Sequence, residues 1–173
     1  MNLTSTYFYT AIILNWSHLL KIDAFKDQII QSLELLVSRK KIRVYGFVIM
    51  PNHIHFIWRN LEMNGKKIPD ESCKKFISHV FKKKLAKKDP ALLEGFLVNK
   101  FDRQYQFWKR NALSVELLSR EMLEQKLTCL LMNPVQAHWN LVDDPNNYYY
   151  SSCSFYESGN RMFNWLTDYR EDF

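Results

Sequence analysis

The first 41 residues contain two apolar segments, one with the residue types of a buried strand and one with the spacing of a helix. Tyr7 to Trp16 is rich in aromatic and β-branched residues and is apolar on both faces, which predicts a central strand. From Ala24 to about Lys41 the apolar residues recur at helical spacing between charged and polar ones. This second pattern predicts an amphipathic helix that packs on a sheet, with Asp23 as its N-cap.

Two short apolar runs follow, separated by a turn. Ile42 to Met50 and His53 to Trp58 have the residue types of strands, and the second run alternates between two faces. Pro51 and Asn52 between them favour a tight reversal of the chain. We therefore expect the two runs to form an antiparallel hairpin.

A second helix is predicted after a polar loop, with Asp70 or Ser72 as its N-cap and Asp89-Pro90 at its end. Seven of the fifteen residues from 74 to 88 are lysine and none is acidic. Lysine faces are often only solvated, but this density also favours contact with phosphates. The candidate DNA-contacting residues are Lys74, Lys75, Lys82, Lys83, Lys84, Lys87 and Lys88, together with Arg103, Lys109 and Arg110 further along the chain.

The next part of the chain predicts one strand and one long helix. The aromatic run from Gln104 to Lys109 is typical of a strand, and Arg103, Lys109 and Arg110 flank it. A helix is predicted from Ser114, as N-cap, to Met132. Pro134 disfavours helical geometry at the residue before it, so the helix should stop there.

The order of these elements predicts the class of fold. Strand, helix, strand, strand, helix, strand is the order of a ferredoxin-like βαββαβ antiparallel sheet with its helices on one face, an α+β fold, here with an additional long C-terminal helix. With 173 residues, 47% of them hydrophobic, the chain is long enough for one well-packed core. We expect a single domain over residues 1–173, with a core at about 7–135 and a tail, 136–173, that folds back over it.

His53 and His55 are the residues in this pattern that suggest chemistry. Because side chains alternate along a strand, both imidazoles should point to the same face. Two imidazoles on a rigid strand can bind one metal ion, although both residues can equally be hydrogen-bonded parts of the strand. If the long C-terminal helix packs across the same face, its last turns can complete a metal site.

Charge and cysteine content indicate the kind of partner and the compartment. Lys and Arg number 24 against 18 Asp and Glu, a formal charge of +6, which favours polyanionic partners. Three widely spaced cysteines with no CxxC pair suggest neither a disulfide framework nor a zinc cluster, and fit a reducing cytoplasm. The apolar N-terminal stretch is short and is interrupted by Asn15, Ser17 and His18, which argues against a signal peptide or a membrane span.

Two segments resemble a known family. VIMPNHIHFIW resembles the histidine-hydrophobe-histidine (HUH) motif of single-strand DNA transposases, and QFWKRNALSVELLSREMLEQKL followed by MNPVQAHWNLVDDPNNYYYSS resembles the C-terminal half of the REP-associated tyrosine transposases. The resemblance extends from Tyr7 to Ser152. It implies a ferredoxin-like nuclease that binds single-stranded or hairpin DNA and a divalent metal, magnesium or manganese. It also implies a cytoplasmic, nucleoid-associated protein that is a monomer or a homodimer.

The same resemblance implies roles for residues at the end of the long helix. Members of the family carry a nucleophilic tyrosine on this helix and, one turn later, an amide side chain as third metal ligand. The amide is present here as Asn133, so the implied metal ligands are His53, His55 and Asn133. Cys129 stands at the position of the tyrosine. A thiol is much shorter than a phenol, so the resemblance predicts impaired cleavage.

Three functional hypotheses remain open from the sequence. The first is a transposase that acts on DNA by metal-assisted phosphodiester transesterification, with Cys129 or a tyrosine of the cluster Tyr148, Tyr149 and Tyr150 as nucleophile. The second is a domesticated or decayed DNA-binding protein that keeps the fold and the metal site without cleavage. The third is a hydrolase in which metal-activated water replaces the side-chain nucleophile.

Overall fold

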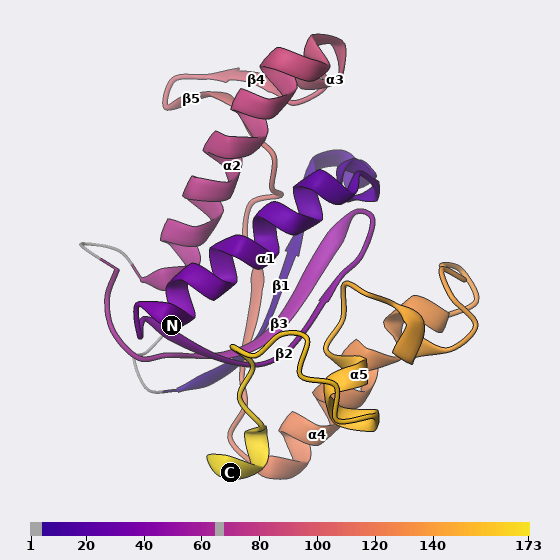
Figure 1. Ribbon diagram of the computed structural model, residues 1–173. Coiled ribbons are helices and arrows are strands. Elements are labelled where there is room, and N and C mark those ends of the chain that lie inside the picture. Colours follow the sequence, from indigo (N-terminus) through magenta and orange to yellow (C-terminus); the bar gives the residue numbers. More distant parts are fainter. Residues whose placement is uncertain (1–4, 65–67) are drawn as a thin grey trace.

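The computed structural model describes residues 5–64 and 68–173 (Figure 1), so residues 1–4 of the expected single domain lie outside the described part. The helices and strands are β1 (Thr6–Ile12), α1 (Asp23–Ser38), β2 (Ile42–Ile49), β3 (His53–Asn60), α2 (Pro69–Lys88), α3 (Pro90–Glu94), β4 (Leu97–Lys100), β5 (Arg103–Tyr105), β6 (Leu113–Glu116), α4 (Arg120–Leu131) and α5 (Cys153–Glu157).

The main sheet has the strand order β2-β3-β1-β6, and all of its neighbouring strands are antiparallel. Helix α1 connects β1 to β2, and α2 lies between β3 and β6. This is the ferredoxin-like order, so the predicted α+β fold is confirmed. The predicted hairpin is also present, because β2 and β3 pair along their length around Pro51 and Asn52.

The two faces of the sheet carry separate hydrophobic clusters. Tyr9, Phe56 and Trp58 pack on one face against residues of α1 and α2. Phe8 and Ile57, which alternate with them, pack on the other face against α4. Figure 1 shows α1 and α2 on one side of the sheet and α4 with α5 on the other. The additional helix therefore covers the face that the ferredoxin-like helices leave open.

The prediction of a fourth strand over Gln104 to Lys109 was wrong, because the fourth strand of the sheet is β6. Phe107 and Trp108 are buried instead in the cluster beneath α2, where the ring of Phe107 lies 5.8 Å from that of Phe81. Their backbone pairs with the chain at the end of β1 only through an isolated antiparallel bridge between Trp108 and Ile13, so the aromatic pattern reflects burial in the core and not a strand of the sheet. The residues of β6 are exposed or half-buried, so they carry little hydrophobic signal.

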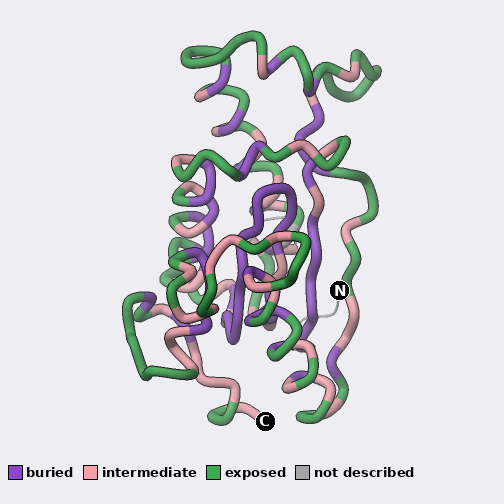
Figure 2. The backbone as a smooth tube through the Cα atoms, turned by 90° about the vertical axis from the view of Figure 1, so that its right-hand side faces the viewer, coloured by how far each residue is buried: buried purple, intermediate pink, exposed green. Residues whose placement is uncertain are grey.

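The segment between α2 and β6 forms a small lobe of its own. Helix α3 is followed by a two-stranded ribbon of β4 and β5, which is separate from the main sheet. Figure 1 shows this lobe projecting from the end of α2, and Figure 2 shows that most of its backbone is exposed. Phe101, in the turn of the ribbon, is fully exposed.

The long C-terminal helix begins later than predicted. Ser114 belongs to β6, and α4 starts at Arg120, with Ser119 as its N-cap. The Ser119 hydroxyl accepts a hydrogen bond from the backbone N–H of Met122 at 3.3 Å. Both serines suit an N-cap chemically, so cap chemistry alone did not distinguish them. The helix ends at Leu131, close to the predicted stop before Pro134.

Other element ends differ in smaller ways. β1 ends at Ile12, and a 3₁₀ turn follows in which Asn15 and Trp16 have positive φ angles of 55° and 56°. Helix α2 begins at Pro69 with Ile68 as its N-cap, so neither Asp70 nor Ser72 caps it. Among the helices of the described residues, none is both long enough and apolar enough to cross a membrane.

The tail after α4 runs along the outer edge of β2. Backbone N–H groups of Ile49 and Ser152 donate across this edge, each at 2.9 Å, to the carbonyls of Tyr150 and Phe47. Further on, the backbone N–H of Thr167 donates to Val44 at the same distance. These bonds satisfy backbone groups of β2 that an edge strand would otherwise expose.

Close packing of α4 on β2 leads to a stability prediction at Gly46. A Cβ atom at Gly46 would lie 2.7 Å from Cδ1 of the buried Leu127, which is closer than van der Waals contact. We expect Gly46→Val to lower the free energy of unfolding in urea by about 1–3 kcal/mol through overpacking. A double-mutant cycle with Leu127→Ala is the control, and the pair should be less destabilised than the sum. Additive effects would contradict this contact.

Candidate functional site

The two histidines of β3 lie on the face of the sheet that α4 covers. In the antiparallel pairing, His55 is opposite Thr10 and His53 is opposite Ile12. Both pairs alternate with core residues that face α1 and α2, so the imidazoles share the opposite face. Their ring centroids are 4.7 Å apart and the rings are nearly perpendicular.

Each imidazole is held by a hydrogen bond at Nδ1. Nδ1 of His53 lies 2.7 Å from Oδ1 of Asn52, and Nδ1 of His55 lies 2.7 Å from the hydroxyl of Thr10. An amide oxygen only accepts, so Nδ1 of His53 carries the hydrogen and Nε2 keeps its lone pair when the ring is neutral. Such an outer hydrogen bond is the usual way to orient a metal-binding histidine.

Burial also keeps both rings neutral. Desolvation lowers the pKa of His53 to about 4, with a further contribution from the charge of His138. Desolvation lowers the pKa of His55 to about 3, helped by His53 and by Lys126 on α4. Both values lie below the ordinary 6.5, so at neutral pH each ring has a lone pair available for a cation.

A cavity of about 390 Å³ contains both imidazoles and the end of α4. Cys129, in the last turns of α4, and Asn133, at the start of the 3₁₀ turn that follows, also line it. The structure therefore brings together four residues that the sequence assigned to one site, from parts of the chain about 75 residues apart. Cys129 is exposed and Asn133 is half-buried.

Several residues of this cavity were not predicted as part of a site. Thr10 and Trp16 line it from β1 and the turn after it, and Gln136, His138 and Trp139 line it after α4. The Trp139 ring lies 5.7 Å from that of His53. Alternation along β1 puts Thr10 on one face of its strand, but the sequence does not show that this strand lies beside β3. Thr10 becomes a site residue only once the pairing of Thr10 with His55 is known. Trp16 and Trp139 enter through turns, which have no hydrophobic period that could have revealed them.

The donor set fits a hard or borderline divalent cation. Among the described residues, no group of three His, Cys, Asp or Glu side chains is placed to bind a metal. The residues in the cavity are instead two neutral imidazoles with oriented rings and the amide of Asn133. This set leaves coordination positions open for water or phosphate oxygens, which suits manganese or magnesium, with zinc as a competitor.

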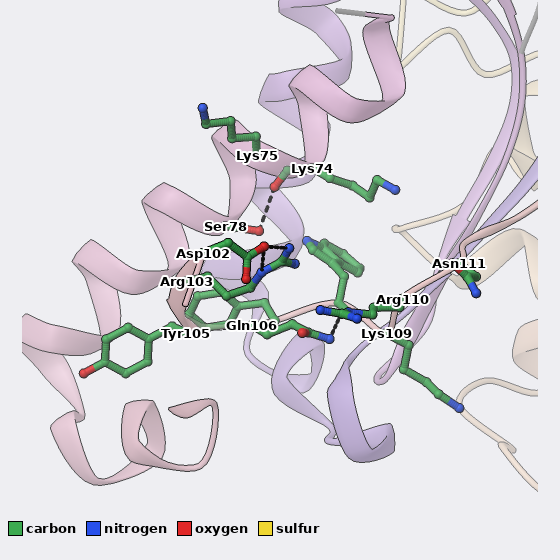
Figure 3. A pocket seen from close by; sticks show the side chains of 12 residues that line it. Lys74, Lys75, Ser78, Asp102, Arg103, Tyr105, Gln106, Lys109, Arg110 and Asn111 are labelled. Carbon is green, nitrogen blue, oxygen red and sulfur yellow. Dashed lines mark hydrogen bonds and ion pairs between the residues drawn. The ribbon is translucent and has the colours of Figure 1, made fainter. Parts of the chain in front are cut away.

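The predicted basic residues lie in two places. Lys74, Lys75, Arg103, Lys109 and Arg110 line a second cavity, of about 540 Å³, between α2 and the segment after β5 (Figure 3). Lys82, Lys83, Lys87 and Lys88 are exposed on α2. Lys84 is half-buried, and its ammonium group donates to the carbonyl of Ala24 on α1 at 3.0 Å. Lys84 therefore also joins two helices of the core.

The fold of this chain is also found among solved structures. The structure of a REP-associated tyrosine transposase bound to a REP hairpin superposes with a TM-score of 0.59 over 96% of this chain and 84% of that one, at 17% sequence identity. The similarity shows that the two proteins share a fold, as the family resemblance implied. Neither a protein-family model nor a curated protein matches the sequence.

The buried imidazoles make the stability of the metal-free protein depend on pH. As pH falls through 6.5 the unfolded chain takes up protons at His53 and His55 that the folded chain does not, because their folded pKa values are about 4 and 3. Stability should therefore fall as pH falls. We expect the free energy of unfolding in urea with EDTA to drop by about 2 kcal/mol per ring between pH 7.5 and pH 5.

The matched control is a variant with both rings replaced, His53→Gln with His55→Gln. Its free energy of unfolding should change much less over the same pH range. Carboxylates with lowered pKa values, such as Asp172, lose their contribution only at lower pH and should not obscure the result. An equal loss in both proteins would show that the rings are not buried in the neutral form.

Proposed function

We propose that this protein is an HUH-type, transposase-like protein that binds hairpin DNA, with a divalent ion held by His53, His55 and Asn133. We further propose that it cleaves DNA poorly or not at all, because Cys129 stands where the related transposases carry a tyrosine. A DNA partner would associate the protein with the nucleoid in the cytoplasm. The observation that carries the proposal is the cavity shared by the two imidazoles, Asn133 and Cys129.

The fold supports a DNA partner. The transposase with which this chain shares its fold was solved with a REP hairpin bound. The superposition covers most of both chains, so the similarity includes the sheet together with its helices. The lysines of α2 and the basic residues of the second cavity supply positive charge that phosphates require.

The residues around the first cavity have distinct roles in this proposal. His53 and His55 would supply Nε2 atoms and Asn133 its amide oxygen. A divalent ion bound there would polarise the scissile phosphate and neutralise developing charge, a contribution of several kcal/mol in metal-assisted reactions. Lys126, whose charge contributes to the lowered pKa of His55, would add attraction for the phosphate backbone.

Cys129 is the reason to expect weak cleavage. A tyrosine at this position would carry its phenolic oxygen across the cavity, whereas the sulfur of cysteine lies one bond beyond Cβ. The thiol would thus fall several ångströms short of a phosphate bound to the imidazole side. Two tyrosines of the tail are poorly suited to substitute, because Tyr148 donates a hydrogen bond to the carbonyl of Ile49 and Tyr150 donates one to Asp27. Burial also raises the pKa of both phenols, which disfavours the phenolate.

DNA binding should depend strongly on salt. We expect a labelled hairpin DNA to bind at low salt and to be released as salt rises, because neutralising each phosphate releases a counterion. Replacing Lys82, Lys87 and Lys88 by Ala should weaken binding. It should also lower the slope of log K against log salt by about one for each phosphate that the variant no longer neutralises. Fluorescence anisotropy at several salt concentrations measures both quantities.

The control removes the same charge elsewhere, with Lys21, Arg39 and Arg161, all exposed, replaced by Ala. This variant should keep most of the affinity and the slope of the native protein. Equal weakening in the two triple variants would mean that total charge, and not the face of α2, determines binding.

Restoring the tyrosine should restore chemistry. With manganese and labelled hairpin DNA, the native protein should bind without forming a covalent adduct. The variant Cys129→Tyr should form a protein-DNA adduct that survives denaturing electrophoresis, because the phenol can reach a phosphate that the thiol cannot. Adding His53→Ala to that variant should abolish the adduct.

Each other outcome of this assay has a defined meaning. Efficient adduct formation by the native protein, with an inactive Cys129→Tyr variant, would show that the nucleophile lies elsewhere. Free cleaved ends without an adduct would indicate hydrolysis by metal-activated water, which the open side of the cavity can admit.

A further inference from the structure

Lys126 is a cation on the face of α4 that meets the histidines. Residues three and four apart share one face of a helix, so Lys126 lies one turn before Cys129 and two turns before Asn133 on the same side. Cys129 and Asn133 line the histidine cavity. The ammonium group of Lys126 lies 5.4 Å from the ring centre of Phe8 on β1, and that ring stacks on His55 with their centres 5.2 Å apart. The side chain of Lys126 therefore extends from α4 to the sheet beside the imidazoles.

This ammonium group has no counter-ion among the described residues. Lys126 is half-buried, and none of the ion pairs within the described part of the chain includes it. Glu124, the acidic residue closest to it in sequence, is instead held by Arg120 and Tyr169, at 2.8 and 2.9 Å from its Oε1 atom. A partly desolvated cation without a partner is unfavourable, and its cost is recovered when an anion binds. The position of Lys126 therefore favours a negatively charged ligand.

The charge of Lys126 acts on the proposed metal site itself. It contributes, after burial and the charge of His53, to the lowered pKa of His55. A divalent ion bound by the same imidazole would be repelled by the ammonium group in the same way. A phosphate between the ion and the ammonium group would reverse the sign, because its oxygens attract both. Cationic side chains and metal ions flank the reacting phosphate in this manner in phosphoryl-transfer sites.

We propose that Lys126 contacts the non-bridging oxygens of the DNA phosphate at the metal and thereby makes the binding of metal and DNA mutually dependent. In the free protein the ammonium group lowers the affinity of the histidine site for a divalent ion. In the DNA complex it raises that affinity, since the phosphate links the two cations. By linkage, the ion strengthens DNA binding by the same factor. The inference rests on the proposed function, because it assumes a metal at the histidines and a DNA phosphate beside it.

This role differs from that of the exposed lysines of α2. Their charge attracts DNA whether or not a metal is bound, so their removal weakens binding in either case. Removing the charge at Lys126 should have opposite effects in two states. It should strengthen metal binding in the absence of DNA, because a repulsion is lost, and it should reduce the gain in metal affinity that DNA produces.

The test measures Mn²⁺ binding by electron paramagnetic resonance, which distinguishes free from bound Mn²⁺. The native protein should bind Mn²⁺ about tenfold more tightly with saturating hairpin DNA than without it, within the usual range of coupling between two sites. Lys126→Met should bind Mn²⁺ several-fold more tightly than the native protein without DNA, and should lose most of the increase that DNA produces. The variant His53→Ala, measured with the same hairpin, gives the Mn²⁺ that binds to DNA phosphates alone.

Two variants control for the substitution itself. Lys126→Arg keeps the charge and should keep the coupling. Lys40→Met makes the same change at an exposed lysine that precedes β2, at the end of the β2–β3 pair opposite to His53, and it should behave as the native protein does. Unfolding curves should show that every variant is folded.

The remaining outcomes separate this inference from the proposed function. If Lys126→Met binds Mn²⁺ as the native protein does, with and without DNA, the role of Lys126 is overturned and the proposed function stays intact. Weaker Mn²⁺ binding by Lys126→Met in the absence of DNA would also overturn that role, since the side chain would then support the metal site structurally. If the native protein binds no more Mn²⁺ than His53→Ala does, or does not bind the hairpin, the proposed function and this inference both fail.

Discussion

The candidate site depends on the antiparallel pairing of β1 with β3. Its register places His55 opposite Thr10 and fixes which face each residue of the two central strands occupies. A shift of one residue would move both imidazoles into the cluster beneath α1 and α2 and expose Phe56 and Trp58 to α4. Because those large rings pack against α1 and α2 on their present face, the packing of the core and the position of the histidines are set by the same register.

The position of α4 follows from that face. Because Gly46 has no side chain, Leu127 of α4 can approach the backbone of β2 closely. The helix crosses the sheet with its C-terminal end at the histidines. Pro134 then ends the helix at the point where Asn133 can face the same cavity. The site is thus built from regular elements held by close packing, which is the kind of scaffold that gives precise geometry.

The sequence predicted those parts of the fold and site that a strong period controls. Alternation along His53 to Trp58 was enough to place two imidazoles together, and Pro134 was enough to end a helix near Asn133. Sequence periodicity did not reveal β6, whose exposed residues lack a pattern, or the role of Phe107 and Trp108 as core beneath α2. The sequence grouped the lysines of α2 with Arg103, Lys109 and Arg110 as one candidate DNA-contacting set, and five of these residues line the second cavity. The cavity itself could not be predicted, because its shape depends on how α2 packs against β5 and the segment that follows it.

The tail that lines the edge of β2 has a consequence for association between copies of the chain. Its hydrogen bonds occupy the backbone groups along one side of an eight-residue strand. The opposite edge of the sheet is β6, which is only four residues long and offers little ladder to a neighbour. Removal of the tail would expose the backbone groups of β2 and the apolar side chains that the tail covers. This edge could then pair with the same strand of another copy, which would favour aggregation.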